Sequence, residues 1–324
     1  MATISDVAKL AGMSVSTVSR VINNKPHVTE EKRLKVQEAM KALGYSPLQA
    51  ARQMRGSGSN NIAVVVPTIT NNFFACLVDS IERECRKHQY KTLITQTYGE
   101  KQNEEEAMGL LSMHHADGII LCSIENEWEM LKSYLNYGKL IACNEYNEGF
   151  YQATEYLLSK EKRGIAYCTG TKSLALQPIG ANIDSDRYTG YVDALSDKGI
   201  FTNQRWLFRG IGTLEDGRKV IRQIMEMDQN NRPEAIIAGS DEVAAGMVME
   251  AAKVGLRIPE DLAIMGVDDQ PLATFLQIPL TTIRQPVQEE GKLAAREMVR
   301  QLTEDSEDAI RTELELELVI RQSA

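Results

Sequence analysis

Apolar residues at the start of the chain recur with the spacing of one helix face. In residues 4–11 they stand at positions i, i+3, i+4 and i+7, namely Ile4, Val7, Ala8 and Ala11. This spacing predicts a short amphipathic helix. Thr3 can cap its first turn, and Gly12 can end it.

The same period continues in two further segments. A second helix is predicted after Ser14, whose hydroxyl can accept from a backbone N–H of the first turn. Its apolar face is Val18, Val21 and Ile22. A third helix, ended by Gly44, is predicted after a Thr29 cap, with the apolar positions Val36, Ala39, Met40 and Leu43. Three short helices, the first two joined by a tight glycine turn, are typical of a helix-turn-helix.

The second helix, within "SVSTVSR", has an outward face of small side chains and one arginine. Because its apolar residues face inward, Val15, Ser16, Ser19 and Arg20 face outward. Small side chains let a helix enter the DNA major groove, where Arg20 can contact guanine, Ser16 can bond to either base type and Val15 can contact a thymine methyl. Thr17 and Ser19 are better placed for phosphates. The alternative is a plain three-helix bundle with hydroxyls at its caps.

Beyond residue 60 the pattern changes to short apolar runs that alternate with amphipathic helices such as Phe73–His88 and Asp241–Gly255. The predicted strands are Ile62–Pro67, Thr92–Gln96, Gly118–Cys122, Leu140–Cys143, Ile165–Thr169, Trp206–Arg209, Ala235–Gly239 and Ala263–Val267. This alternation predicts parallel sheets with helices on both faces, and about 260 residues suffice for two lobes. The last segment, "TELELELVIRQ", alternates acid and leucine, which predicts a strand with one wet face.

Ligands of open α/β sheets bind beyond the carboxyl ends of the strands. Polar, aromatic or charged residues stand there: Thr70–Phe74, Ser240–Asp241 and Asp268–Asp269, with Arg187 opening a helix. Arginine, carboxylates and aromatic rings suit a polyhydroxylated ligand. Asp241 is better explained as a helix N-cap, and Asp269 as a structural residue.

Charge is divided unevenly along the chain. Residues 1–56 carry nine basic and four acidic side chains, a net charge of +5, so the remainder carries −14 of the total of −9. A basic head on an acidic body indicates a polyanionic partner for the head, although a solvated basic surface would look the same. Five scattered cysteines without a CxxC pair, and no apolar signal or membrane-spanning run, indicate a cytoplasmic protein with reduced thiols.

Between head and body lies "YSPLQAARQMRGSGSNN", residues 45–61. Residues 48–55 can form a helix that is too short to be stable alone in water, and a Gly-Ser linker follows. On DNA this helix could fold and insert Met54 as an apolar wedge in the minor groove. An ordinary interdomain linker is the alternative. The expected organisation is therefore a head at 1–46, a hinge helix and linker at 47–60, and a body at 61–324.

Several stretches resemble the LacI/GalR family of bacterial repressors. They are "TISDVAKLAGMSVSTVSRVINN", "AARQMRG", "ADGIILC", "DRYTGYVDAL", "GSDEVAAGMVMEAAKVGLRIPEDLAIMGVDDQPLA" and "PLTTIRQP". The resemblance covers essentially the whole chain. "MSVSTVSRVINNKPHVTEEKR" and "NEWEMLKSYLNYGKLIAC" look most like the catabolite-control-protein branch of Gram-positive bacteria.

The resemblance implies an N-terminal all-α helix-turn-helix head and an α/β body of two doubly wound parallel-sheet lobes, similar to periplasmic sugar-binding proteins. It implies a homodimer that reads a pseudo-palindromic operator and responds to a sugar or sugar phosphate. By position, Val15, Ser16 and Arg20 would read bases and Met54 would be the hinge wedge. "PLTTIRQP" would be a crossover between the lobes.

The resemblance also places the effector contacts. Arg187 and Asp268 match the family's ligand positions best, followed by Phe73 or Phe74 and Ser240. In the catabolite-control branch, a phosphorylated histidine-containing phosphocarrier protein docks near the positions of Arg296 and Arg300. Exposed arginines beside acidic neighbours are the simpler explanation of that pair.

The chain departs from the family pattern at three places. Gly212 stands where many relatives have an aromatic ligand residue. Compared with the family, about a dozen residues are absent between "LIACNEYNE" and "ATEYLL" and about two before "EKRGIAY", so these loops are either truly short or incomplete in this sequence. These departures bear on which effector is bound.

Other classes of function fit the sequence less well. A transport-type binding protein would carry a signal peptide and no basic head. An enzyme would need a catalytic constellation, but no GxGxxG, P-loop or GxSxG motif occurs. His114 and His115 are adjacent and would point to different faces of a helix, so no metal site is expected. No catalytic residue and no cofactor is expected.

Overall fold

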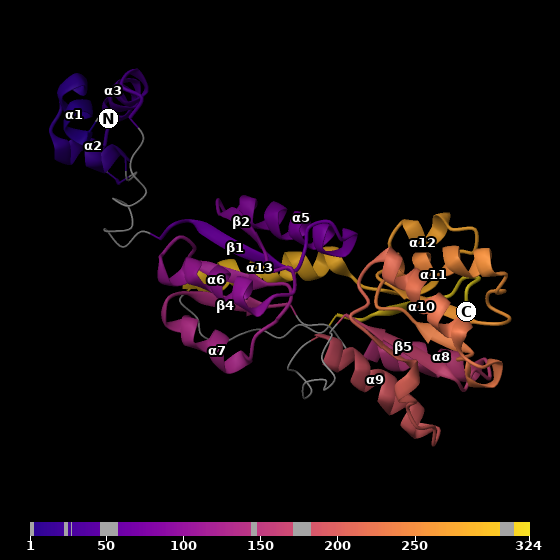
Figure 1. Cartoon of the computed structure of the whole chain (residues 1–324). Coiled ribbons are helices and arrows are strands. Elements are labelled where there is room, and N and C mark those ends of the chain that lie inside the picture. The colour runs from indigo at the N-terminus through magenta and orange to yellow at the C-terminus, as the bar shows by residue number, and fades with distance from the viewer. Residues whose placement is uncertain are drawn as a thin grey trace. The chain divides into compact units, whose positions relative to one another are not determined.

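The computed structural model describes residues 3–22, 25–26, 28–45, 58–143, 148–170, 183–304 and 314–324. Side chains of residues 148 and 183–186 are outside this description. Contacts divide the chain into two units, Met1–Ser59 and Asn60–Ala324, which are drawn together in Figure 1. Most of the predicted hinge, including Met54, lies outside the described residues.

The first unit is a bundle of three helices, as the apolar period predicts. They are α1 (Ile4–Ala11), α2 (Val15–Ile22) and α3 (Glu30–Ala42). Its buried residues are those of the predicted inward faces: Val7, Ala8, Val18, Val21, Val36 and Ala39. Burying these side chains offsets the entropy lost when short helices form, since none would be stable alone.

The predicted helix ends hold except for the side-chain cap of α3, which Gly44 ends as predicted with φ 57°. Thr3 and Asp6 form a reciprocal capping box, and Gly12 closes α1 at φ 65°. The hydroxyl of Ser14 accepts from the backbone N–H of Thr17 at 3.2 Å. Thr29 occupies the N-cap position of α3 without a side-chain cap bond. The start of α3 is stabilised instead by two acidic side chains in its first turn, Glu30 and Glu31, which interact favourably with the positive end of the helix dipole.

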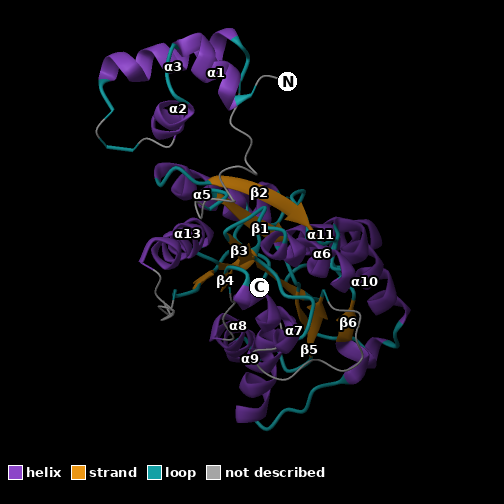
Figure 2. Ribbon diagram, turned by 90° about the vertical axis from the view of Figure 1, so that its left-hand side faces the viewer, coloured by secondary structure: helices purple, strands orange, loops and turns teal. Residues whose placement is uncertain are grey.

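The body contains two sheets, each with helices on both faces (Figures 1 and 2). The first lobe has the parallel order β2-β1-β3-β4. Its strands are β1 (Asn61–Val66), β2 (Lys91–Gln96), β3 (Gly118–Leu121) and β4 (Lys139–Ala142). Alternate residues of β1 pack on opposite faces, with α5 (Asn72–Lys87) and α13 (Val287–Glu304) on one side. On the other are α6 (Lys101–Ser112) and α7 (Trp128–Lys132), followed by a 3-10 turn at Ser133–Asn136.

The second lobe has the order β10-β9-β8-β7-β5-β6. Its strands are β5 (Ile165–Thr169), β6 (Leu207–Arg209), β7 (Ala235–Ile237), β8 (Ala263–Val267), β9 (Thr281–Arg284) and β10 (Glu317–Val319). Only β10 is antiparallel among these described pairs. Helices α8 (Glu148–Ser159) and α9 (Ile183–Asp197) cover one face, and α10 (Leu214–Glu226) and α11 (Asp241–Val254) cover the other. Short turns at Gln204–Trp206, Gln229–Asn231 and α12 (Leu272–Phe275) complete the lobe.

One predicted crossover is in part a strand. Thr281–Arg284, within "PLTTIRQP", forms β9 and pairs with β8, and the chain then leaves for α13 of the first lobe. The sequence of β9 does not predict a strand by itself. Thr281, Thr282 and Ile283 are all buried, so the segment shows no alternation of polar and apolar residues. Within the described residues, no helix is long and apolar enough to span a membrane.

Candidate DNA-binding surface and effector site

The structure places the predicted DNA-reading side chains on one surface of α2. Val15, Ser16 and Arg20 are exposed, whereas Val18 between them is fully buried. Val15 is 44% exposed, so its side chain is accessible for an apolar contact. The side chain of Arg20 makes no ion pair with any described residue. A long donor therefore stands beside small side chains on a protruding face, as major-groove reading requires.

Hydroxyl groups organise the start of α2. The Ser14 Oγ lies 2.9 Å from both Ser16 Oγ and Thr17 Oγ1. Thr17 and Ser19 are half-buried at the flank of the exposed face. This arrangement orients the Ser16 hydroxyl at the start of the exposed face and places the hydroxyls of Thr17 and Ser19 at its flank, where they suit phosphate oxygens.

The two predicted aromatic residues lie in the first lobe, just beyond the carboxyl end of β1. Asn71 caps α5 by accepting from the backbone N–H of Phe73 at 2.8 Å. The rings of Phe73 and Phe74 meet edge to face with centroids 5.2 Å apart. Phe73 is only 6% exposed and belongs to the core of its lobe, whereas Phe74 is half-buried. Phe74 is therefore the better stacking surface of the two.

The other predicted effector residues lie at the carboxyl ends of the strands of the second sheet. Neighbouring strands β7 and β8 bring Ser240 and Asp268 to the same edge. Arg187, from α9, joins them by donating from its guanidinium to the Gly239 carbonyl at 3.1 Å. Residues from three separate elements thus meet where ligands of α/β sheets bind.

Arg187 is held by a residue that sequence reasoning missed. Its guanidinium carbon lies 5.1 Å from the ring centroid of Phe150 in α8, in a cation–π arrangement. Phe150 is 1% exposed and Arg187 8% exposed. Nothing in the sequence marks Phe150 for this contact, because it reads as an ordinary core residue of an amphipathic helix.

Asp268 has an uncommon backbone conformation. Its φ is +102°, which is rare for a residue other than glycine and marks strain that recurs at functional sites. Its carboxylate accepts from the side-chain amides of Gln270 at 3.0 Å and Gln285 at 2.6 Å. These two glutamines were not predicted; they fix the carboxylate that the sequence predicts to contact the effector.

The N-cap of α11 is Ser240, and the prediction that Asp241 caps this helix is wrong. The hydroxyl of Ser240 accepts a hydrogen bond from the backbone N–H of Val243 at 3.3 Å. This hydroxyl therefore uses one of its acceptor positions to cap the helix. Asp241 is fully buried and accepts from the Gln270 backbone N–H and from the Thr282 hydroxyl, both at 2.6 Å. It ties α11 to β9 and to the turn after β8.

Asp269 has the structural role that the sequence suggested. Its carboxylate pairs with Arg284 at 2.7 Å and with Arg321 at 2.5 Å. It therefore joins the end of β8 to β9 and to the C-terminal segment.

Burial raises the pKa of Asp241 to about 7, although the hydrogen bonds from Thr282 and Gln270 act in the opposite direction. In the unfolded chain an aspartate loses its proton at about pH 4. In the folded protein a carboxyl with a raised pKa keeps its proton to higher pH. The contribution of Asp241 to the unfolding free energy should therefore fall as pH rises from about 4 to about 7. Asp241→Asn, which is neutral and similar in shape, should remove this part of the pH dependence. Thermal unfolding of both proteins across this range measures it, and equal slopes would contradict the assignment.

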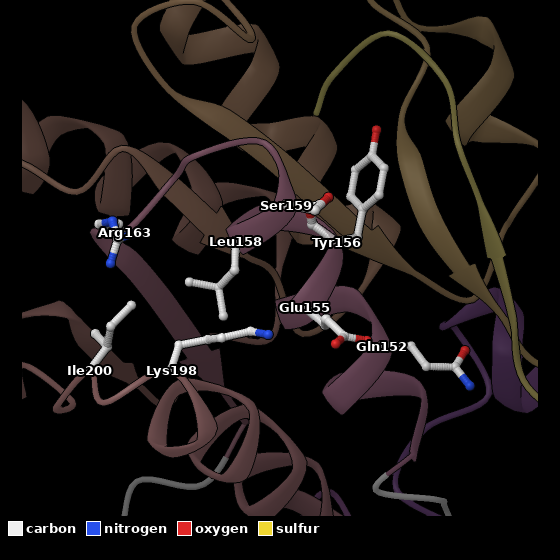
Figure 3. Close-up of a pocket in the computed structure, with 8 residues that line it drawn as sticks. All are labelled: Gln152, Glu155, Tyr156, Leu158, Ser159, Arg163, Lys198 and Ile200. Carbon is white, nitrogen blue, oxygen red and sulfur yellow. Dashed lines mark hydrogen bonds between the residues drawn. The ribbon is translucent and has the colours of Figure 1, made fainter.

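A cavity of about 560 Å³ lies elsewhere in the second lobe, between α8 and α9 (Figure 3). It is lined by Gln152, Glu155, Tyr156, Leu158, Ser159, Arg163, Lys198 and Ile200. None of the five predicted effector residues lines it. Its charged side chains are exposed, and Tyr156 turns its hydroxyl to the carbonyl of Ala324 at 3.0 Å. In Figure 3 the Lys198 side chain extends toward Glu155.

No group of three or more histidine, cysteine or acidic side chains in the described ranges could hold a metal ion.

Comparison with known families gives two matches, one within the head and one within the body. The profile described as bacterial regulatory proteins, lacI family, matches residues 3–47. The profile described as a periplasmic binding protein-like domain matches residues 154–324.

Individual relatives match along the whole chain. The NTD biosynthesis operon regulator NtdR of Bacillus subtilis (strain 168) is 35% identical over 337 residues, covering 100% of both chains. The ribose operon repressor of Haemophilus influenzae is 32% identical, covering 100% of this chain and 98% of the relative. Among solved structures, a LacI family transcriptional regulator from Lactobacillus casei with bound glucose is 31% identical, with a TM-score of 0.71. That match covers 82% of this chain and 99% of the other.

Proposed function

The chain belongs to the lacI family of bacterial regulatory proteins, and from this premise we propose that it represses genes of carbohydrate metabolism under the control of a small effector. It is a DNA-binding transcription regulator with a helix-turn-helix head and an effector-binding body. The relatives are regulators, and we accordingly assign binding rather than catalysis to both sites.

The exposed face of α2 carries the proposal for DNA. Val15, Ser16 and Arg20 would contact base edges, and Thr17 and Ser19 would contact phosphates. The head is small, so a second copy would be needed for a site long enough to be specific in a genome. We therefore include a homodimer on a pseudo-palindromic operator in the proposal, with Met54 as the minor-groove wedge between half-sites.

The carboxyl edge of the second sheet supports a sugar or sugar phosphate as effector. A buried arginine and a carboxylate held by two amides present donors and acceptors at fixed positions, as recognition of several hydroxyls needs. Phe74 of the first lobe offers a ring for the apolar face of a sugar. The related L. casei regulator has been solved with glucose bound, which favours this ligand class here.

Docking of a phosphorylated phosphocarrier protein is the alternative trigger, and the structure favours it less. Arg296 donates from Nε to Glu84 at 2.8 Å, and Arg300 donates to Glu297 at 2.8 and 2.7 Å. Glu84 is only 4% exposed in its side chain and also bonds to Lys87 at 2.6 Å. The phosphate would have to compete with these carboxylates for both arginines.

Capture of genomic DNA by the purified full-length protein, followed by sequencing, tests the proposed function. We expect enrichment of a pseudo-palindromic motif upstream of genes for sugar uptake or breakdown. Capture with Arg20→Ala protein supplies the background. Absence of a shared motif would contradict the DNA role, and a motif upstream of unrelated genes would contradict the assignment to carbohydrate metabolism.

A further inference from the structure

Two of the five cysteines come together at the carboxyl edge of the first sheet. Cys122 directly follows β3 and Cys143 directly follows β4. These strands are parallel neighbours, with Leu121 opposite Ala142, so the two cysteines are the next residues in register. The Cys143 N–H donates to the Leu121 carbonyl at 2.8 Å, which shows that the ladder still holds at this point.

The two side chains point to the same side of the sheet. Both belong to the apolar cluster beneath α5 and α13, with exposures of 2% and 7%. Neighbouring strands lie about 4.8 Å apart, within the Cα separation of about 4.4–6.8 Å that a disulfide spans. The hydrogen bond with Cys122, together with burial, raises the pKa of Cys143 well above its ordinary value. The register and the shared cluster therefore place the two thiols side by side.

The other three cysteines lack such a neighbour in register. Cys76 lies in α5, and Cys85 lies in its last turn, hence at the opposite end of the sheet from the strand ends. Cys168 lies near the end of β5 in the second lobe, opposite Phe208 of β6. Cys168 is thus a matched control, because it is a buried thiol near the end of a parallel strand without a second thiol beside it.

The cysteine pair is close to two of the three places where the chain passes between the lobes. After Cys143 the chain continues through residues 144–147 into α8 of the second lobe. Glu290, in the first turn of α13 just after the return from β9, acts electrostatically on Cys143. A covalent bond here would tie the beginning of one crossover to a central strand of the first sheet, next to the end of a second crossover.

We propose that Cys122 and Cys143 are an oxidation site, at which peroxide forms a disulfide that changes how the body couples effector binding to operator binding. The coupling part rests on the proposed function; the disulfide does not. Chemically, the thiolate of one cysteine attacks hydrogen peroxide, giving a sulfenic acid and releasing hydroxide. The second sulfur attacks this sulfenic sulfur and displaces the hydroxyl group. In total, two thiols and one peroxide give one disulfide and two waters.

Access to the buried pair comes from the edge of the sheet. β4 is the edge strand of the order β2-β1-β3-β4, and three of its four residues are only half-buried. Edge elements open locally more readily than central ones. Because the thiol of Cys143 stays protonated at neutral pH, oxidation should be slow there and accelerate at alkaline pH.

Treatment of the reduced full-length protein with hydrogen peroxide, at several pH values, tests the site. We expect the loss of two thiols per chain, and a disulfide-linked peptide pair containing Cys122 and Cys143 in mass spectrometry. Cys168→Ser should leave this product unchanged, whereas Cys122→Ser and Cys143→Ser should abolish it. A wild type that keeps both thiols, or links other cysteines, overturns the proposal without reference to any variant.

The regulatory part is tested on a DNA fragment captured from the genome. Operator affinity of oxidised and reduced wild type, with and without glucose as the probe, should differ by about fivefold or more in at least one of these conditions. The Cys122→Ser protein should show no change upon oxidation. Equal affinities of the two wild-type forms would overturn the coupling. Failure of the reduced protein to bind any genomic fragment would instead overturn the proposed function and leave the disulfide result standing.

Discussion

Arg20→Ala is expected to weaken binding to the cognate operator by about 1–3 kcal/mol and to relax the preference at one base position. The reason is geometric. Arg20 is exposed on α2, next to Ser16 and Val15, and makes no ion pair with any described residue. It can therefore donate two hydrogen bonds to one guanine, which alanine cannot replace. Fold stability should change little, because the core residues of the head are on the opposite face.

A matched control separates base reading from charge. Lys41→Ala removes the same charge from an exposed position on α3. If Lys41 contacts DNA at all, its loss should weaken binding about equally on all sequences. Selection from a randomised operator library, done at one salt concentration with all three proteins, measures both effects. An Arg20→Ala protein that selects the same bases as the wild type would show that Arg20 does not read sequence.

Arg187→Ala is expected to abolish the response to the effector while leaving operator binding of the effector-free protein largely intact. Arg187 is buried, bonds to the Gly239 carbonyl and stacks on Phe150. Its removal deprives ligand hydroxyls of their donor, and each group left unpaired in a buried site costs about 1–3 kcal/mol. Asp268→Ala should have the same effect through loss of the acceptor. An effector changes operator affinity only if it binds one arrangement of the lobes more tightly than the other. A variant that does not bind the effector therefore shows no change in operator affinity.

Calorimetry with a panel of sugars and sugar phosphates, repeated in the presence of operator, measures this response. Arg163→Ala is the control, because Arg163 is an exposed arginine of the same lobe that lines the cavity between α8 and α9. Loss of response in Arg163→Ala but not in Arg187→Ala would move the effector site to that cavity. If no panel member binds, and the phosphorylated carrier protein changes operator affinity through Arg296 and Arg300, docking replaces the small effector as the trigger.

The sequence by itself determined the local elements of this protein. The helices of the head follow from apolar spacings that span fewer than fifteen residues each, and the capping of Thr3, Gly12 and Ser14 needs only adjacent residues. Short apolar segments between amphipathic helices indicate parallel strands, so eight strands could be predicted from the chain, including partly exposed edge strands such as β2. The outward face of α2 was predictable for the same reason, since the helix period alone decides which side chains lie opposite the core.

Only the tertiary structure decided which distant residues meet. The assignment of α13 to the first lobe, the pairing of β9 with β8, and the bonds of Asp241 to Thr282 and Gln270 depend on strand order. The contact of Phe150 with Arg187 and the registration of Cys122 beside Cys143 depend on it too. A local period constrains which face a side chain occupies, but not which other element covers that face. The partner is chosen by the packing of whole layers, whose contacts join residues far apart in the chain.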